Sequence, residues 1–153
     1  MIVRRTAYGA SMDFRVSYTH LSDEVVVVSV AGEVDVYRAP RLREALNGRI
    51  GHGSSLVLVD LRQTTALDAT GLGVLVGCLK RVRARRGALV VVTQQDCVLR
   101  QFRSTGLTRV LPVSPTVAQA LAELTRIRPG LVLRPLDSGS DDESAQVSQG
   151  LLG

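Results

Sequence analysis

Residues 67–73, with the sequence LDATGLG, combine a hydroxyl, a carboxylate and two glycines at the start of a predicted helix. Thr70 is a good helix N-cap, because its hydroxyl can accept a hydrogen bond from a backbone N–H of the first turn. A phosphate on Thr70 would lie at the helix N-terminus, where free N–H groups and the helix dipole favour negative charge. It would add about −1.5 to −2 charge close to Asp68, so we expect it to disrupt a partner contact. Both interpretations, a cap and a phosphorylated switch, stay open.

The glycines of this segment suggest a third interpretation, dinucleotide binding. The Rossmann turn needs its first glycine directly after the strand and the spacing G-x-G-x-x-G. Here about nine residues separate the expected strand end at Leu61 from Gly71, and the third glycine, Gly77, comes one position late. Gly73 and Gly77 share a helix face, where we expect another backbone to approach closely. Because G-K-[ST] and G-x-S-x-G motifs are also absent from the sequence, we predict no catalytic residues.

A second polar segment, residues 32–35 with the sequence GEVD, follows another predicted strand. Asp35 and Asp68 each come after a strand, and the carboxyl ends of neighbouring parallel strands meet at one rim of the sheet. We therefore expect the two carboxylates to share a rim. The alternative is that Glu33 and Asp35 are solvated loop carboxylates.

The surrounding pattern predicts one α/β domain with a mixed β-sheet of four to five strands and about four helices. Strand-like runs cover residues 14–18, 25–31, 56–61, 88–93 and 110–113. Helices are expected from Pro40 to Gly48 or Gly51, over residues 70–86 and 96–103, and from the segment 114–116 onwards. Ser22 and Asp23 predict a turn that makes the first two strands an antiparallel hairpin. We expect a flexible arm over residues 1–12, a folded domain over 13–127 and a largely disordered tail over 128–153. Met12 is a possible natural start.

The composition of the 153-residue chain narrows the function further. Hydrophobic residues make up 45%, enough for a core, but aromatic residues make up only 3%, which argues against stacking single-stranded nucleic acid. The net charge of +5 is concentrated in residues 80–86, so we interpret it as a basic helix end that steers a partner rather than as a nucleic-acid site. Two cysteines and two isolated histidines predict no metal site. With no membrane-spanning run and no signal peptide, a cytoplasmic location is expected.

The ordered motifs resemble the STAS domain of bacterial anti-sigma factor antagonists over residues 14–125. They are Gly-Glu-x-Asp followed by Ala-Pro, the strand LVLVDL, and Asp-x-[Ser/Thr]-Gly-Leu-Gly before a helix. The resemblance implies a STAS-like domain that binds an anti-sigma factor carrying a GHKL-type serine/threonine kinase domain, and so frees a sigma factor. It further implies that the kinase phosphorylates the residue before Gly-Leu-Gly, using its own ATP and Mg, and that a PP2C-type phosphatase reverses this. No cofactor is expected in this chain.

Position by position, the resemblance makes Thr70 the phosphate acceptor. The expected partner-binding residues are Glu33, Asp35, Asp68, Ala69, Thr70, Gly71, Leu72 and Gly73. The chain departs from the family in carrying Thr rather than the more frequent Ser as acceptor, Ala69 in place of a frequent Ser, and Tyr37-Arg38 before Ala-Pro, which would alter partner choice. The alternative is a STAS scaffold or sensor subunit that is not phosphorylated.

Overall fold

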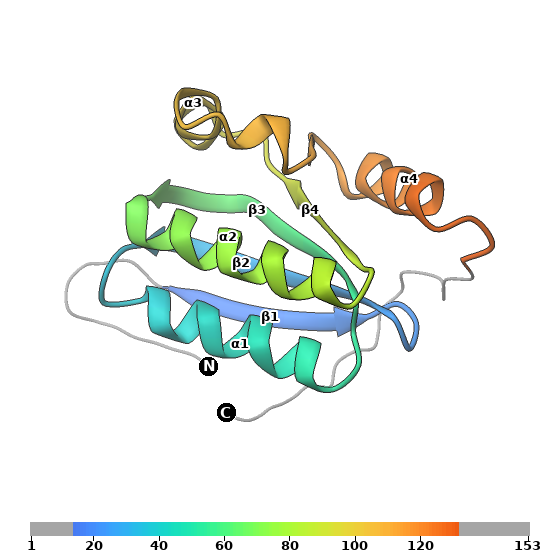
Figure 1. Ribbon diagram of the computed structural model, residues 1–153. Helices are drawn as coiled ribbons and strands as arrows, with labels where there is room; N and C mark the ends of the chain where they lie inside the picture. Colours follow the sequence, from blue (N-terminus) through green and yellow to red (C-terminus); the bar gives the residue numbers. More distant parts are fainter. Residues whose placement is uncertain (1–13, 132–153) are drawn as a thin grey trace.

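A five-stranded mixed sheet, with strands in the order β1-β2-β3-β4-β5, forms the centre of the computed structural model, which describes residues 14–131 (Figure 1). The strands are β1 Arg15–His20, β2 Val25–Val34, β3 Leu56–Leu67, β4 Ala88–Val92 and β5 Val113–Ser114. The helices are α1 Ala39–Gly51, α2 Ala69–Ala84, α3 Asp96–Ser104 and α4 Val117–Ile127, with a 3₁₀ turn at Leu107–Arg109. The predicted mixed α/β architecture is confirmed. The expected arm over residues 1–12 and all but residues 128–131 of the expected tail lie outside the described residues.

The predicted hairpin is present at the start of the sheet. β1 pairs with β2 in antiparallel register, and the Ser22 hydroxyl accepts hydrogen bonds from the N–H groups of Glu24 and Val25, both at 3.1 Å. The later strands all pair in parallel, as expected when helices connect them. β1 is therefore an edge strand, as its alternating sequence predicts.

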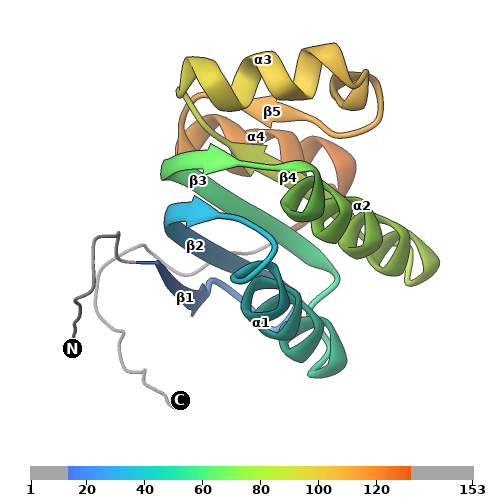
Figure 2. The same ribbon diagram turned by 90° about the vertical axis from the view of Figure 1, so that its left-hand side faces the viewer.

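Apolar side chains, most of them aliphatic, fill a core on each face of the sheet. One cluster joins α1, α2 and α3 to the sheet, and includes Leu42, Leu75 and Phe102, all fully buried. The other places Ala120 and Leu124 of α4 against Val25, Leu58 and their neighbours on the opposite face. Figure 2 shows α1 and α2 together on one side of the sheet. The carboxyl ends of β2 and β3, which precede these two helices, are left at one rim.

Both of these strands are longer than the sequence predicts. β2 continues past Gly32, whose φ of +96° lies in the left-handed region, and the register with β3 shifts on either side of it. The Thr64 hydroxyl donates to the carbonyl of Val30 at 2.9 Å and helps to hold the extension of β3. β3 therefore ends at Leu67 instead of Leu61, so the prediction that nine residues separate the strand from Gly71 is wrong. Gly77 still comes one position too late for the Rossmann spacing.

The predicted strand at residues 110–113 is also corrected. The chain forms a 3₁₀ turn over Leu107–Arg109, and only Val113 and Ser114 pair with β4. Val110, which was expected to begin the strand, instead ends the 3₁₀ turn.

Candidate functional site

The two aspartates that follow β2 and β3 share one rim of the sheet, as predicted. Val34 and Leu67 are register partners in the parallel pair, and Asp35 and Asp68 come directly after them. The N–H of Asp68 donates to the carbonyl of Val34 at 3.1 Å, which continues the pairing by one residue. In Figure 1 the arrowhead of β3 and the first turns of α1 and α2 lie at this same end of the molecule.

The start of α2 is capped by Asp68, so the prediction that Thr70 is the N-cap is wrong. Asp68 has an extended backbone, and its Oδ1 accepts a hydrogen bond from the N–H of Gly71 at 3.1 Å. The helix begins at Ala69, which makes Thr70 its second residue. Both Asp and Thr suit the cap position, and the length of β3 selects the earlier residue.

The hydroxyl of Thr70 therefore does not accept the capping hydrogen bond of α2. Thr70 is half-buried, and its hydroxyl makes no hydrogen bond with any residue between 14 and 131. It lies in the first helical turn, where backbone N–H groups lack intrahelical partners and the dipole is positive. A negatively charged group on this oxygen fits the local electrostatics of the helix, although the carboxylate of Asp68 is two residues away.

The glycines beside Thr70 differ in what surrounds them. A Cβ on Gly71 would lie 2.5 Å from Leu67 Cδ1 and 3.0 Å from Val34 Cγ1, so the absence of a side chain lets α2 approach the strand ends. Gly73 is exposed and a Cβ there would meet no atom within 4 Å, while one on Gly77 would meet only the Arg81 guanidinium. The expectation that Gly73 and Gly77 receive another backbone within the fold is therefore wrong. Gly73 instead leaves an open surface next to Thr70.

The remaining predicted residues divide between surface and core. Ala69 and Glu33 are exposed at the rim, whereas Leu72 is only 6% exposed and anchors α2 in the core. The Asp35 carboxylate forms its hydrogen bonds and its ion pair with residues of the loop that follows it. Its Oδ1 accepts from the N–H groups of Tyr37 and Arg38, both at 3.0 Å, and its Oδ2 pairs with the Arg38 guanidinium at 2.7 Å.

Two apolar side chains at the rim extend the predicted set. Val36 is 55% exposed and Tyr37 is 84% exposed, in the loop that Asp35 holds between β2 and α1. Sequence reasoning noted Tyr37 only as a departure from the family and missed Val36. The sequence does carry a signal for their exposure, since Val36 and Tyr37 form an apolar pair between a turn-forming Asp and the Pro that opens a helix. Exposed aromatic side chains of this kind are enriched at protein interfaces.

A groove of about 1060 Å³ lies elsewhere, along the β1–β2–β3 part of the sheet. Its charged lining includes Asp60 and Arg62, which pair at 2.8 Å, and this contact raises the pKa of the Arg62 guanidinium. None of the eight predicted partner-binding residues lines the groove. The rim around Thr70 is thus an open surface of carboxylates, small residues and two apolar side chains, a composition that suits contact with a protein.

Residues 14–131 contain neither a metal-binding cluster nor a membrane-spanning helix. No group of three or more His, Cys, Asp or Glu side chains is arranged there to hold a metal ion. Among the helices of the same residues, none combines the length and the apolar character needed to cross a membrane.

Comparison with known proteins identifies the family of the folded domain. Residues 19–120 match the STAS domain family. The anti-sigma-B factor antagonist of Listeria monocytogenes is 32% identical over 102 residues, which are 67% of this chain and 90% of that protein. The Bacillus subtilis anti-sigma-B factor antagonist is 38% identical over 89 residues, or 58% and 81% of the two chains.

Among solved structures, an anti-sigma factor antagonist from Mycobacterium paratuberculosis superimposes with a TM-score of 0.67 and 28% identity. The match covers 73% of this chain and 94% of the mycobacterial protein. The family match spans most of the sheet, the helices α1 to α3 and the first four residues of α4, and it includes the whole candidate rim. The chain therefore belongs to the STAS domain family.

Proposed function

We propose that this protein is an anti-sigma factor antagonist that phosphorylation of Thr70 switches off. The relatives from Listeria monocytogenes and Bacillus subtilis are anti-sigma-B factor antagonists, and 90% and 81% of their own lengths align with this chain. The observation that best supports phosphorylation of Thr70 is the position of its hydroxyl. It lies at the N-terminus of α2 without a hydrogen bond to any described residue, beside the open surface at Ala69 and Gly73.

In the proposed cycle the unphosphorylated rim binds an anti-sigma factor and so releases a sigma factor. The anti-sigma factor carries a GHKL-type kinase domain, which supplies ATP and Mg. Thr70 Oγ1 forms a bond to the γ-phosphorus while the bond to the β-phosphate oxygen breaks. ADP leaves, and the hydroxyl proton passes to a base of the kinase. A PP2C-type phosphatase later hydrolyses the phosphate ester.

The added charge would act on the interface more than on the fold. The phosphate lies where the helix dipole stabilises an anion, so α2 has no electrostatic reason to unfold. It nevertheless places about −1.5 to −2 charge within two residues of Asp68, on a surface that otherwise presents small side chains. A partner that fits this surface must then accommodate a bulky dianion, and affinity falls.

The first experiment is phosphorylation of the full chain by its anti-sigma factor and labelled ATP. Thr65 is the matched control, because it also has an exposed hydroxyl and lies in β3 only five residues before Thr70. Wild type and Thr65→Ala should be labelled equally. Thr70→Ala should lose the label. Equal label on Thr70→Ala would overturn the site. Binding of the anti-sigma factor without any label on wild type would favour an unphosphorylated scaffold.

The second experiment measures affinity for the anti-sigma factor by calorimetry. Phosphorylated wild type and Thr70→Glu should bind at least tenfold more weakly than unphosphorylated protein, or about 1.4 kcal/mol. Thr70→Val, which keeps the shape of the side chain and adds no charge, should bind like the unphosphorylated protein. Unchanged affinity after phosphorylation would contradict the release mechanism.

A further inference from the structure

The last two turns of α2 and the residues that follow form a strongly basic surface. Its five exposed cations are Lys80, Arg81, Arg83, Arg85 and Arg86. Residues 69–87 contain no Asp or Glu, so no carboxylate within the helix offsets these charges. We call these five residues the basic end of α2.

The contacts of these side chains leave their charge uncompensated. Arg83 donates to the carbonyl of Val110 at 3.1 Å, and Arg85 donates to the carbonyl of Ile50 at 2.7 Å. Both acceptors are neutral. Among residues 14–131, the ion pairs are formed by other arginines, and no carboxylate pairs with the basic end. A surface with this concentration of one sign of charge attracts anionic groups.

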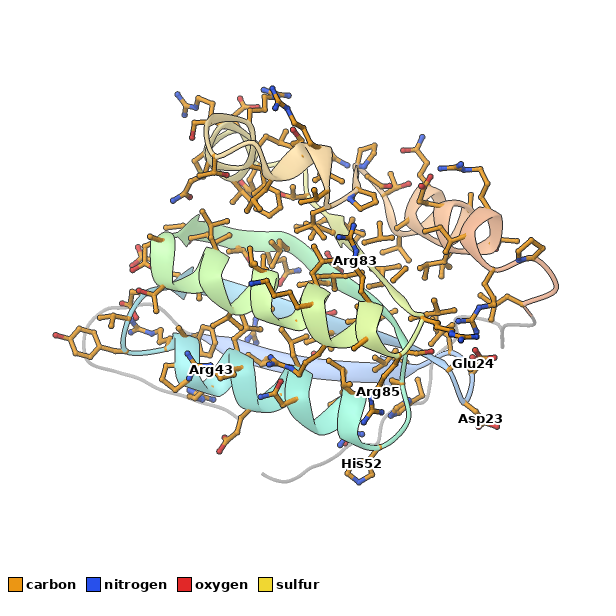
Figure 3. The ribbon with its side chains drawn as sticks, viewed as in Figure 1. Asp23, Glu24, Arg43, His52, Arg83 and Arg85 are labelled. Atoms are coloured by element: carbon orange, nitrogen blue, oxygen red, sulfur yellow. The ribbon has the colours of Figure 1, made fainter. Side chains whose placement is uncertain are left out.

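The chain leaves α4 directly beside this surface. The guanidinium of Arg128 pairs with the Glu24 carboxylate, and its Nη2 donates to the carbonyl of Arg86 at 2.9 Å. Three residues later, Leu131 packs against the core cluster under α4. Figure 3 shows Glu24 and Arg85 at the same end of the molecule, next to His52 at the end of α1. Arg128 thus lies next to the basic end, and the chain continues from Leu131 on the face of the sheet that α4 covers.

The sequence beyond that position carries the complementary charge. Residues 137–143 read DSGSDDE and contain four carboxylates within seven residues. Asp137 follows Leu131 by six residues, which reach up to about 20 Å when extended. Lys80, Arg81 and Arg83 lie within about 5 Å of rise along α2, and Arg85 and Arg86 directly follow its last residue. Because the two segments are tethered by so short a linker, their effective concentration is on the order of millimolar.

We infer that the acidic segment of residues 137–143 docks on the basic end of α2. The four carboxylates offset most of the five positive charges. The docked segment competes with any external anionic partner for these cations. It lies at the opposite end of α2 from Thr70, about 20 Å away along the helix, so it leaves the candidate phosphorylation rim open. The contact is independent of the function proposed above.

Paramagnetic relaxation on the full chain tests this contact. A spin label is attached at Ser144→Cys in a Cys97→Ser background, which retains all four carboxylates and leaves only the fully buried Cys78 thiol besides the labelled one. At low salt we expect the label to broaden the amide signals of residues 80–87 more than those of α3. In 1 M NaCl, where the screening length is about 3 Å, that preference should be lost.

Charge variants separate this contact from a general charge effect. Lys80→Glu with Arg81→Glu should abolish the preferential broadening, as should Asp137→Asn, Asp141→Asn, Asp142→Asn and Glu143→Gln combined. Arg100→Glu with Arg103→Glu changes the net charge equally and should leave it intact, because both side chains are exposed on α3 and are not part of the basic end. Broadening that is equal over α2 and α3, or that persists in Lys80→Glu with Arg81→Glu, would overturn the inference.

Discussion

At the residue scale, Gly73 allows partner binding to be separated from folding. It is exposed within α2, and a Cβ there would meet no atom within 4 Å. Gly73→Ala should therefore raise the free energy of unfolding by up to about 1 kcal/mol, because alanine is the better helix former. The same methyl group would project from the proposed interface and weaken binding of the anti-sigma factor. Urea unfolding and calorimetry measure the two effects.

Gly77→Ala is the matched control for this prediction. It brings the same gain in helix propensity one turn further along α2, and its Cβ would lie 3.6 Å from the Arg81 guanidinium, an ordinary contact. Its affinity for the partner should stay at the wild-type value. If Gly73→Ala also binds like wild type, the first turns of α2 are not part of the interface.

Tyr37 is the second residue whose effect should appear in binding alone. Its side chain is 84% exposed, so Tyr37→Ala should change the free energy of unfolding by no more than about 0.5 kcal/mol. An exposed aromatic at an interface is a common binding hot spot, and we expect its loss to weaken affinity by about 1–2 kcal/mol. Tyr37→Phe keeps the ring and should retain most of the affinity. Equal binding by Tyr37→Ala would place the β2–α1 loop outside the contact.

At the scale of elements, Asp68 has two roles at the start of α2. Its side chain accepts the capping hydrogen bond, and its negative charge lies at the positive end of the helix dipole. Its Oδ1 accepts from the N–H of Gly71, so Asp68→Ala should lower the free energy of unfolding by about 1 kcal/mol. Asp68→Asn retains an oxygen acceptor without the charge and should recover most of this loss. Chemical unfolding of both variants measures the difference. If the two variants are equally destabilised, the carboxylate charge stabilises α2 rather than the capping hydrogen bond.

The elements were predictable from sequence where the pattern is local. Runs such as Val25–Val28 have the β-branched composition of buried strands, and the helices show apolar positions at helical spacing. The ends of β2 and β3 were not predictable, because Gly32 interrupts the first run and the sequence after Leu61 is polar. Their extension depends on contacts between strands, including the bond from Thr64 to the carbonyl of Val30.

The same distinction explains the candidate site. The aspartates after β2 and β3 could be predicted to share a rim, since parallel strand ends meet there whatever the strand lengths. The sequence predicted Thr70 as the N-cap of α2, whereas the structure has Asp68 in that position. The prediction failed because it underestimated the length of β3. The exposure of Val36 could not be predicted, because an apolar residue in a loop is buried or exposed according to what covers it in three dimensions.

At the scale of the whole molecule, α2 connects two chemically different ends. Its N-terminus places Thr70 and Asp68 at the rim where β2 and β3 end, and its C-terminus carries the basic end that leads into β4. The 16 residues of α2 separate these surfaces by about 24 Å. Two contacts of opposite electrostatic character can therefore form on one small domain without competing for the same residues.

Cys78, halfway along α2, makes the integrity of the core sensitive to alkaline pH. It is fully buried between the helix and the sheet, and burial raises the pKa of its thiol from 9.0 to about 11. The unfolded chain thus loses this proton at lower pH than the folded chain. The stabilisation is complete below pH 9 and is lost as the pH rises through about 11, at a cost on the order of 2–3 kcal/mol.

The difference between wild type and Cys78→Ala across pH 8–11 isolates this contribution from the other groups that titrate there. We expect the stability of Cys78→Ala, measured by urea unfolding, to fall less steeply above pH 9 than that of wild type, because the variant has no buried thiol to deprotonate. Cys97→Ala retains the buried thiol and should follow the wild-type curve. Parallel curves for wild type and Cys78→Ala would mean that the core admits the thiolate without penalty, which is incompatible with the tight burial of this side chain between α2 and the sheet.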